Sequence, residues 1–169
     1  MIGVNAAGIN SKLESLNAML VKLKPQIWCV QETKLKENET LKCEAIKDFQ
    51  VYYLYRQNSG GGGLALGIDK NIESTLMLQG DDETEVEDVL ADVGGLLVRI
   101  VIGYGYQENS LKSSKDKFCG FLEAEVYKAD FEGQILIIQL YSKLHGGPDL
   151  LKNDPKSAKS KRKIISKIF

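Results

Sequence analysis

Five polar residues stand where stretches of apolar sequence end, and α/β proteins usually place their chemistry at such positions. Asn5 follows the first short apolar stretch, Glu32 ends the second and Tyr104 ends a later one. Tyr141 and Lys143 follow the last of these stretches. Polar groups from several strand ends can together bind a phosphate and a metal ion. For each residue alone an ordinary polar strand end is the simpler explanation, but the five together favour a functional site.

Three other motifs do not support a function. The stretch "SGGGGLALG" is rich in glycine, but no Gly-Lys-Ser/Thr follows it, so we interpret it as a flexible hairpin turn and not as a phosphate-binding loop. His145 is the only histidine, which excludes a metal site with two histidines from one chain. The acidic run over 81–88 lacks the spacing of a calcium-binding loop, and we expect it to be solvated.

The elements that must position these residues alternate between strands and helices. The segment "INSKLESLNAMLVKLKP" predicts a helix that begins with a Ser11-x-x-Glu14 capping box and ends before Pro25. Its buried face is predicted to carry Leu13, Leu16, Leu20 and Leu23. Predicted strands cover 26–32, 50–55, 62–68, 74–78, 96–106 and 134–140, and a second helix covers about 110–128.

Length and composition indicate one globular domain. The chain has 169 residues, of which 43% are hydrophobic, enough to build a core. No apolar run approaches the roughly 20 residues of a membrane helix, and the N-terminus lacks the features of a signal peptide. We therefore expect an intracellular protein, in the nucleus or cytoplasm and not secreted. Cys29, Cys43 and Cys119 follow no zinc pattern and are expected to be reduced, with Cys29 in a buried strand.

The charge is distributed unevenly along the chain. The net charge is −1, but residues 156–169 contain six basic residues and no acidic one, which leaves 16 basic and 23 acidic residues, or −7, in residues 1–155. A basic tail can bind phosphates or act as a nuclear address, and it can equally be a solvated end without a role. The residues of this tail that could contact nucleic acid are Lys156, Lys159, Lys161, Arg162 and Lys163.

Several motifs in order resemble the endonuclease/exonuclease/phosphatase superfamily. They are "NAAGINSKLESL", "PQIWCVQETKL", "GGGLALGIDKNI", "VRIVIGYGYQEN" and "ILIIQLYSKLHGGPDLLKNDP", and together they extend over about residues 2–155. Within the superfamily the chain is most similar to the apurinic-endonuclease-like domains of non-LTR retrotransposons, and to craniofacial-development-protein-2-like sequences. The run Gln31-Glu32-Thr33 after an apolar strand is the most recognisable piece.

This resemblance implies a four-layer α/β/β/α sandwich that cleaves phosphodiester bonds of DNA with Mg²⁺. By resemblance, Glu32 is the metal-binding glutamate, Asn5 is the asparagine at the start of the site, and Tyr104 contacts the scissile phosphate. The domain implied by the resemblance covers residues 1–155, followed by the basic tail at 156–169.

Two positions depart from the family pattern. Where the family has Asp-x-Asn at the end of the last strand, this chain has Tyr141-Ser142-Lys143. A phenol, with a pKa of about 10, cannot act as a base at neutral pH, and an ammonium cannot accept a proton. The family's later Ser-Asp-His motif is also missing, so the sandwich is expected to be incomplete and an unpaired sheet edge is expected to promote self-association.

The tail provides a hypothesis about the gene. One coding of the family continuation "NDPNPQNQNGKLF", with an adenine inserted after the proline codon, translates as residues 156–167. The Asp→Tyr and Asn→Lys changes also each need one nucleotide. We therefore interpret the chain as a decayed, frameshifted copy of a retroelement endonuclease.

Two classes of function remain open at this point. The first is a nuclease domain that is catalytically impaired, and the second is a non-catalytic remnant that binds nucleic acid or a protein. Phosphatase activity on a small phosphoester is a third reading, but it needs the same missing residues. Since several positioned groups are lost, we expect the fold to be retained, turnover to be near background, and Mg²⁺ binding to be weak or absent.

Overall fold

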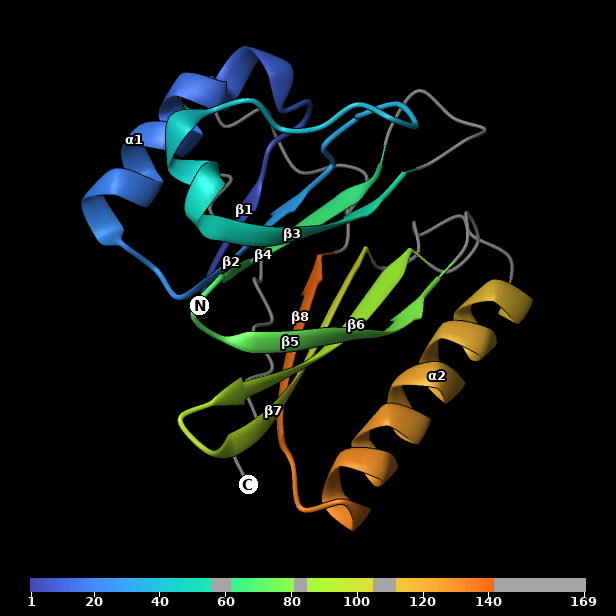
Figure 1. The fold of residues 1–169 in the computed structure, drawn as a ribbon. Helices are drawn as coiled ribbons and strands as arrows, with labels where there is room; N and C mark the ends of the chain where they lie inside the picture. The colour runs from blue at the N-terminus through green and yellow to red at the C-terminus, as the bar shows by residue number, and fades with distance from the viewer. Residues whose placement is uncertain (56–61, 81–84, 105–111, 142–169) are drawn as a thin grey trace, which may run out of the picture.

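The structure, a computed structural model, describes residues 1–55, 62–80, 85–104 and 112–141, which form two stacked four-stranded sheets between helices (Figure 1). One outer layer holds α1 and the other holds α2, so the predicted four-layer α/β/β/α sandwich is confirmed. The elements are β1 (Ile2–Asn5), η1 (Asn10–Lys12), α1 (Leu13–Leu23), β2 (Ile27–Gln31), η2 (Glu44–Asp48), β3 (Phe49–Leu54), β4 (Leu64–Asp69), β5 (Glu73–Gln79), β6 (Val86–Val93), β7 (Leu96–Tyr104), α2 (Lys112–Phe131) and β8 (Ile135–Tyr141).

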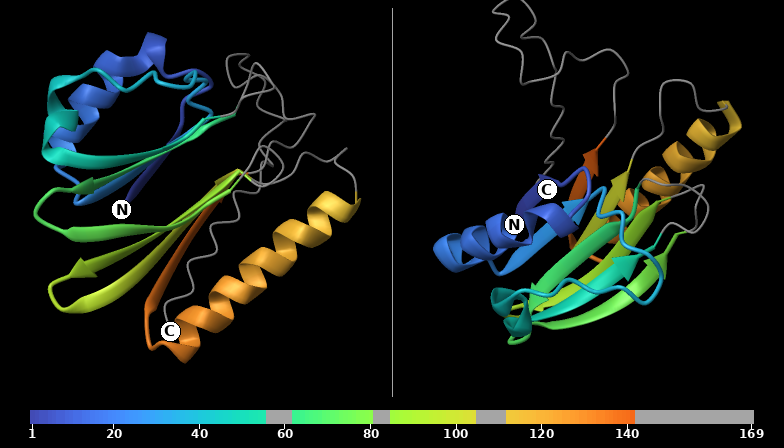
Figure 2. Two further views of the ribbon diagram at one scale, coloured as in Figure 1. Left: turned by 45° about the vertical axis from the view of Figure 1, so that its right-hand side comes forward. Right: turned by 90° about the horizontal axis from the view of Figure 1, so that it is seen from above.

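Each sheet contains one parallel strand pair joined through a helix. The first sheet has the order β1-β2-β4-β3, and β1 runs parallel to β2 by way of α1. The second has the order β5-β6-β7-β8, and β7 runs parallel to β8 by way of α2. All other neighbours are antiparallel. Each sheet is thus built from one uninterrupted stretch of chain, and the left view of Figure 2 shows the two sheets as separate layers.

The main core lies between the sheets. Alternate residues of the facing strands form it, because successive side chains of a strand point to opposite faces. From the first sheet it contains Cys29, Leu66 and Ile68, and from the second it contains Val89 and Ile100, all of them buried. Burial raises the pKa of the Cys29 thiol to about 12. The three cysteines are free, as predicted, and Cys29 lies in a buried strand.

Two smaller cores fix the helices to the outer faces. Leu16 and Leu20 of α1 pack on Trp28 of β2, and Phe118 of α2 packs on the outer face of the second sheet. Gly67 makes room for the Trp28 ring, because a Cβ at this position would lie 2.1 Å from a ring carbon.

The start of α1 differs from the prediction. A 3-10 turn over Asn10–Lys12 precedes the helix, and no side chain caps either element, so the Ser11-x-x-Glu14 capping box does not form. Leu16 and Leu20 are buried as expected, but Leu23, the last residue of the helix, is 53% exposed. The helix ends at Leu23, ahead of Pro25, with Lys24 in a left-handed conformation.

Most predicted strands are found within a few residues of their expected bounds, but β6 was not predicted. The second helix extends to Phe131, three residues beyond its predicted end. The predicted tail at 156–169, the domain boundary at 155 and His145 lie outside the described residues. None of the helices in the described ranges is long and apolar enough to cross a bilayer.

Candidate functional site

Asn5 and Glu32 are brought side by side by the parallel pair β1–β2. Asn5 is the last residue of β1 and is in register with Gln31, the last residue of β2. The pairing continues past both strands, since the Ala6 amide donates to the Gln31 carbonyl at 2.9 Å and the Gly8 amide donates to the Glu32 carbonyl at 2.8 Å. The two predicted site residues of the first sheet, Asn5 and Glu32, therefore lie together at the C-terminal ends of β1 and β2. We call this end of the strands the strand-end edge.

The backbone around these residues is strained. Ala7, Glu32 and Lys34 have φ angles of +48°, +54° and +55°, and they make up three of the five non-glycine residues with positive φ in the described ranges. Each such conformation costs on the order of 1 kcal/mol or more, and such residues cluster at functional sites. The strain falls on the turn that carries Glu32 and on the turn that follows Asn5.

The Asn5 side chain is oriented by its own turn. Its Oδ1 atom accepts a hydrogen bond from the Ala7 amide at 3.1 Å. Its Nδ2 atom is buried and has no hydrogen-bond partner among the described residues. An amide nitrogen is a donor, so the inward-facing group of Asn5 suits an oxygen acceptor such as a phosphate oxygen better than it suits a cation.

Glu32 lies almost buried, at 9% exposure, directly after the last residue of β2. It is the residue that the resemblance assigns to Mg²⁺. The described ranges contain no group of three or more His, Cys, Asp or Glu residues that could hold a metal ion. Mg²⁺ requires near-octahedral oxygen coordination, so the described residues do not fit a complete magnesium site.

The second sheet reaches the same edge through β7 and β8. The last paired residues of these parallel strands are Tyr104 and Tyr141. The backbones of two further predicted site residues therefore lie side by side on neighbouring strands. Gln31 Nε2 donates to the Gly103 carbonyl oxygen at 3.2 Å, so the end of β2 lies against the end of β7. The side chains of Tyr104 and Tyr141, and the whole of Lys143, lie outside the described residues.

The residues Gly62 and Gly63 contribute to this edge in a way that the sequence did not reveal. The Gly63 carbonyl accepts from the Thr33 amide at 3.1 Å, and the Gly62 carbonyl accepts from the Lys34 amide at 2.9 Å. Gly63 also donates its own amide to Glu85 Oε2 at 3.1 Å. These glycines therefore stabilise the turn that carries Glu32. The interpretation of the glycine-rich stretch as a flexible hairpin turn did not predict these contacts.

The interpretation of 81–88 as a solvated acidic run is wrong for residues 85–88. Glu85 lies directly before β6, residues 86–88 begin that strand, and Glu85, Glu87 and Asp88 are all buried. Glu87 is fully buried between the sheets without a hydrogen-bond partner among the described residues, and burial raises its pKa to about 8. The sequence gives only a weak signal, the valine-rich run "VEDVLADV", which lacks the strict alternation of apolar and polar residues that is typical of a half-buried strand.

A second buried charged cluster lies under α2, on the opposite face of β6. Arg99 Nη2 is 2.6 Å from Asp88 Oδ2 and 2.6 Å from Glu125 Oε2. Lys128 extends the cluster, with Nζ 2.7 Å from Glu125 Oε1. Burial raises the pKa of Asp88, although its hydrogen bond to Arg99 opposes the rise. This cluster joins α2 to the sheet, away from the strand-end edge.

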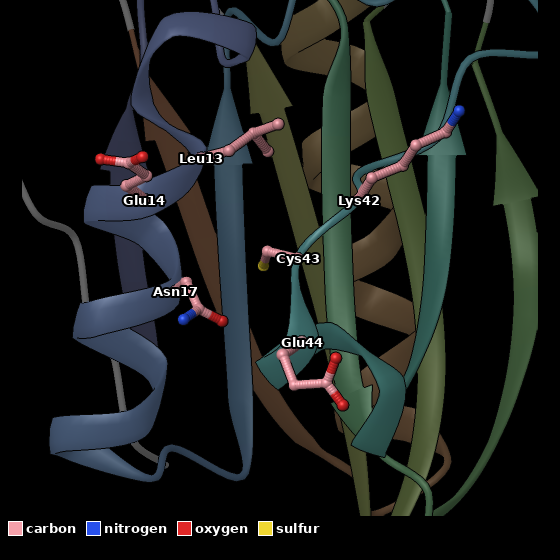
Figure 3. Close-up of a pocket in the computed structure, with 6 residues that line it drawn as sticks. All are labelled: Leu13, Glu14, Asn17, Lys42, Cys43 and Glu44. Atoms are coloured by element: carbon pink, nitrogen blue, oxygen red, sulfur yellow. The ribbon is translucent and has the colours of Figure 1, made fainter.

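A hollow of about 300 Å³ separates α1 from the segment before η2 (Figure 3). Asn17 bridges part of it, since its Oδ1 atom accepts from the Ala45 amide at 2.9 Å. Lys42 points its amine away from α1 (Figure 3), and burial raises the pKa of the Cys43 thiol. The hollow therefore lacks an activated nucleophile. Its lining residues are Leu13, Glu14, Asn17, Lys42, Cys43 and Glu44.

No protein-family model and no curated protein sequence matches the chain. Similar solved structures do exist. The 3'-5' exonuclease NExo from Neisseria meningitidis has a TM-score of 0.59 at 19% identity, and the match covers 82% of this chain and 56% of that one. D. rerio TDP2 complexed with single-strand DNA product has a TM-score of 0.58 at 13% identity, with 81% and 58% covered.

An AP endonuclease from Archaeoglobus fulgidus has a TM-score of 0.52 at 18% identity, with 81% of this chain and 55% of that chain covered. The chain thus spans little more than half the length of these three structures. At such low identities the likeness concerns the fold alone. The chain therefore shares its fold with these three structures.

Proposed function

We propose that the chain is a nuclease-like domain whose site for a phosphodiester lies at the strand-end edge. The observation that carries this proposal is the placement of Asn5 beside Glu32 at an edge that also receives the ends of β7 and β8. The buried donor Asn5 Nδ2 supports an oxygen-rich ligand. The DNA product bound to D. rerio TDP2, which has the same fold, supports DNA as that ligand.

We further propose that catalysis is impaired. In this proposal Tyr141 and Lys143 occupy the positions of an aspartate and an asparagine, and neither replacement can accept a proton at neutral pH. Positioned acid–base groups typically contribute about 10²- to 10⁴-fold each to the rate. Glu32 is then the one carboxylate left for Mg²⁺, so binding of the ion is weak or absent.

The origin and the boundaries of the domain are part of the same proposal. The chain is an intracellular, retroelement-derived domain over residues 1–155, followed by a frameshifted basic tail at 156–169. The alternative function is a non-catalytic remnant that binds nucleic acid or a protein, for which the basic residues of the tail are the supporting feature.

A nicking assay on supercoiled plasmid and on abasic DNA tests the catalytic part. Wild type and Glu32→Ala are compared with Mg²⁺ and with EDTA, and DNA binding is measured for both across a range of salt concentrations. The expected result is DNA binding that weakens with salt, without Glu32-dependent nicking. Mg²⁺-dependent cleavage that is lost in Glu32→Ala would contradict the impairment, and an absence of DNA binding would contradict the nuclease-like assignment.

Calorimetric titration with Mg²⁺ tests the metal part. Wild type is expected to show no specific site, because the proposal puts the Lys143 ammonium near Glu32, and a single carboxylate next to a positive charge would hold the ion poorly. Lys143→Asn should bind Mg²⁺ more tightly than wild type, and the combination with Glu32→Ala should remove the gain. Tight binding by wild type, or no gain in Lys143→Asn, would contradict this part.

We also propose that the protein self-associates through an open sheet edge, because unpaired edge strands are templates for pairing with another chain. Sedimentation velocity at micromolar concentration should detect dimers or larger species. A monomer over the whole concentration range would contradict the proposal.

A further inference from the structure

Strand β8 has an unusual sequence for the edge of a sheet. It is the last strand in the order β5-β6-β7-β8, and among the described residues it pairs only with β7. Its seven residues, "ILIIQLY", contain no charge and no proline. Edge strands of soluble proteins usually carry a charge, a proline or a bulge that prevents pairing with another chain. Residues 135–141 of β8 thus contain no charge and no proline, and their ladder with β7 has no register shift.

The opposite edge of the same sheet shows such protection. Strand β5 has a register shift between Leu76 and Leu78, which interrupts its ladder. It also carries Glu73. The two edges of one sheet therefore differ, and β8 is the one suited to continue the sheet.

The side chains of β8 belong to two cores and remain partly exposed. Ile135 and Ile137 pack against the core between the sheets, whereas Leu136, Ile138 and Leu140 pack against the core under α2. All of them are half-buried although they are aliphatic. Another strand alongside β8 would bury apolar surface on both faces of the sheet, at about 25 cal/mol per Å².

We infer that β8 is the contact strand of a twofold dimer, in which it pairs antiparallel with β8 of a second copy around Ile138. This inference specifies the surface for the self-association proposed above. A twofold axis perpendicular to the sheet at Ile138 keeps the faces of both copies aligned, so the two four-stranded sheets become one continuous sheet.

The sequence of β8 fits its own copy in this register. Leu136 lies opposite Leu140 of the partner, and Ile138 lies opposite itself, on the face that α2 covers. Ile137 lies opposite Gln139 on the inner face. Because like charges directly opposite each other are destabilising, a twofold strand pair requires a charge-free centre, and β8 provides one. A second copy would thus pair with the backbone of β8 and would also cover its apolar side chains.

A charge-swap experiment at the twofold centre tests the inference. Ile138→Lys and Ile138→Glu each place two like charges opposite each other, and each should raise the dimer dissociation constant by more than about tenfold. An equimolar mixture of the two variants should recover the dimer, since the opposite charges then face each other. The matched control is Met77→Lys, which adds a charge to the exposed strand β5 and should leave the dimer unchanged.

Sedimentation velocity is the readout, and circular dichroism confirms that each variant is folded. Dimers that persist in both variants, or variants that stay monomeric when mixed, would overturn the inference while leaving self-association itself in place. A monomeric wild type would overturn both. Neither result depends on DNA binding, so the nuclease-like assignment is tested separately.

Hydrogen exchange of the wild-type protein provides a measurement that needs no variant. Raising the protein concentration from well below to well above the dissociation constant should slow exchange at the amides of β8, while the amides of β5 stay unchanged. Equal rates in β8 at both concentrations would overturn the inference even if the charged variants do not fold.

Discussion

Gln31 of β2 donates a hydrogen bond from Nε2 to the carbonyl oxygen of Gly103 on β7, at 3.2 Å, across the space between the two sheets. Gln31 is buried, and it immediately precedes Glu32. Gly103 immediately precedes Tyr104. This contact therefore joins the two sheets next to the candidate site residues Glu32 and Tyr104.

Replacing Gln31 by methionine should lower the free energy of unfolding by about 1–3 kcal/mol, because the buried Gly103 carbonyl loses its donor. Gln79 provides a matched control, since its Nε2 atom donates to the Tyr53 carbonyl at 2.7 Å but is exposed. Gln79→Met should cost less than about 0.5 kcal/mol. Urea denaturation measures both, and equal losses would contradict a special role for Gln31.

Glu87 should make stability fall as pH rises. Burial raises its pKa from 4.5 to about 8 in the folded protein, so between these pH values the folded chain holds a proton that the unfolded chain has released. The contribution to stability is complete below pH 4.5 and is lost as pH rises towards 8, by on the order of 5 kcal/mol in total. Denaturation from pH 5 to 8.5 should show a shallower decline in Glu87→Gln, whereas parallel curves would contradict the assignment.

Removing Arg99 should be strongly destabilising because Asp88 and Glu125 would remain buried without their shared cation. Breaking a buried ion pair in this way typically costs about 3–5 kcal/mol. The control is Lys47→Met, which removes an exposed ion pair with Glu44 and should cost less than about 1 kcal/mol. We expect thermal and urea denaturation of Arg99→Met to show the larger loss, and similar losses in both variants would contradict it.

Gly63→Ala should destabilise the turn that carries Glu32. The φ angle of Gly63 is +83°, and a Cβ there would lie 2.6 Å from Thr33 Oγ1 and 3.2 Å from the Leu54 carbonyl oxygen. Gly95 has a nearly equal φ of +87° with no atom within 4 Å of the added Cβ, so Gly95→Ala measures the backbone strain alone. Gly63→Ala should therefore lower the free energy of unfolding by more than Gly95→Ala does. Hydrogen exchange at the Thr33 amide should become faster only in Gly63→Ala.

The sequence was sufficient to predict the elements whose periodicity is uniform. The apolar strand around Cys29 and the central leucines of α1, Leu16 and Leu20, were placed correctly because burial there follows a single pattern, whereas Leu23 at the end of the helix is exposed. Strand β6 was missed because its buried positions include carboxylates. Glu87 faces the core between the sheets and Asp88 pairs with Arg99, and that pairing depends on a strand eleven residues away.

The sequence predicted which strand ends meet at the site, but it did not predict the contacts between them. Residues at strand ends identified the edge, since parallel strands end on the same side of a sheet. The contacts that hold the edge together, from Gln31 to Gly103 and from Gly63 to Glu85, join residues 72 and 22 positions apart and leave no local signal. Long-range hydrogen bonds of this kind need the folded coordinates.

The division of the chain into two sheets has a consequence for biosynthesis. Among the described residues, the strands of the first sheet lie between Ile2 and Asp69, and those of the second lie between Glu73 and Tyr141. At roughly 5–20 residues per second, translation of the second stretch takes about 3–14 s. During that time the first sheet can complete its ladder on the ribosome, but Leu66 and Ile68 have nothing to cover them. The nascent chain would therefore expose the apolar inner face of the first sheet during this interval, and a chaperone could bind there.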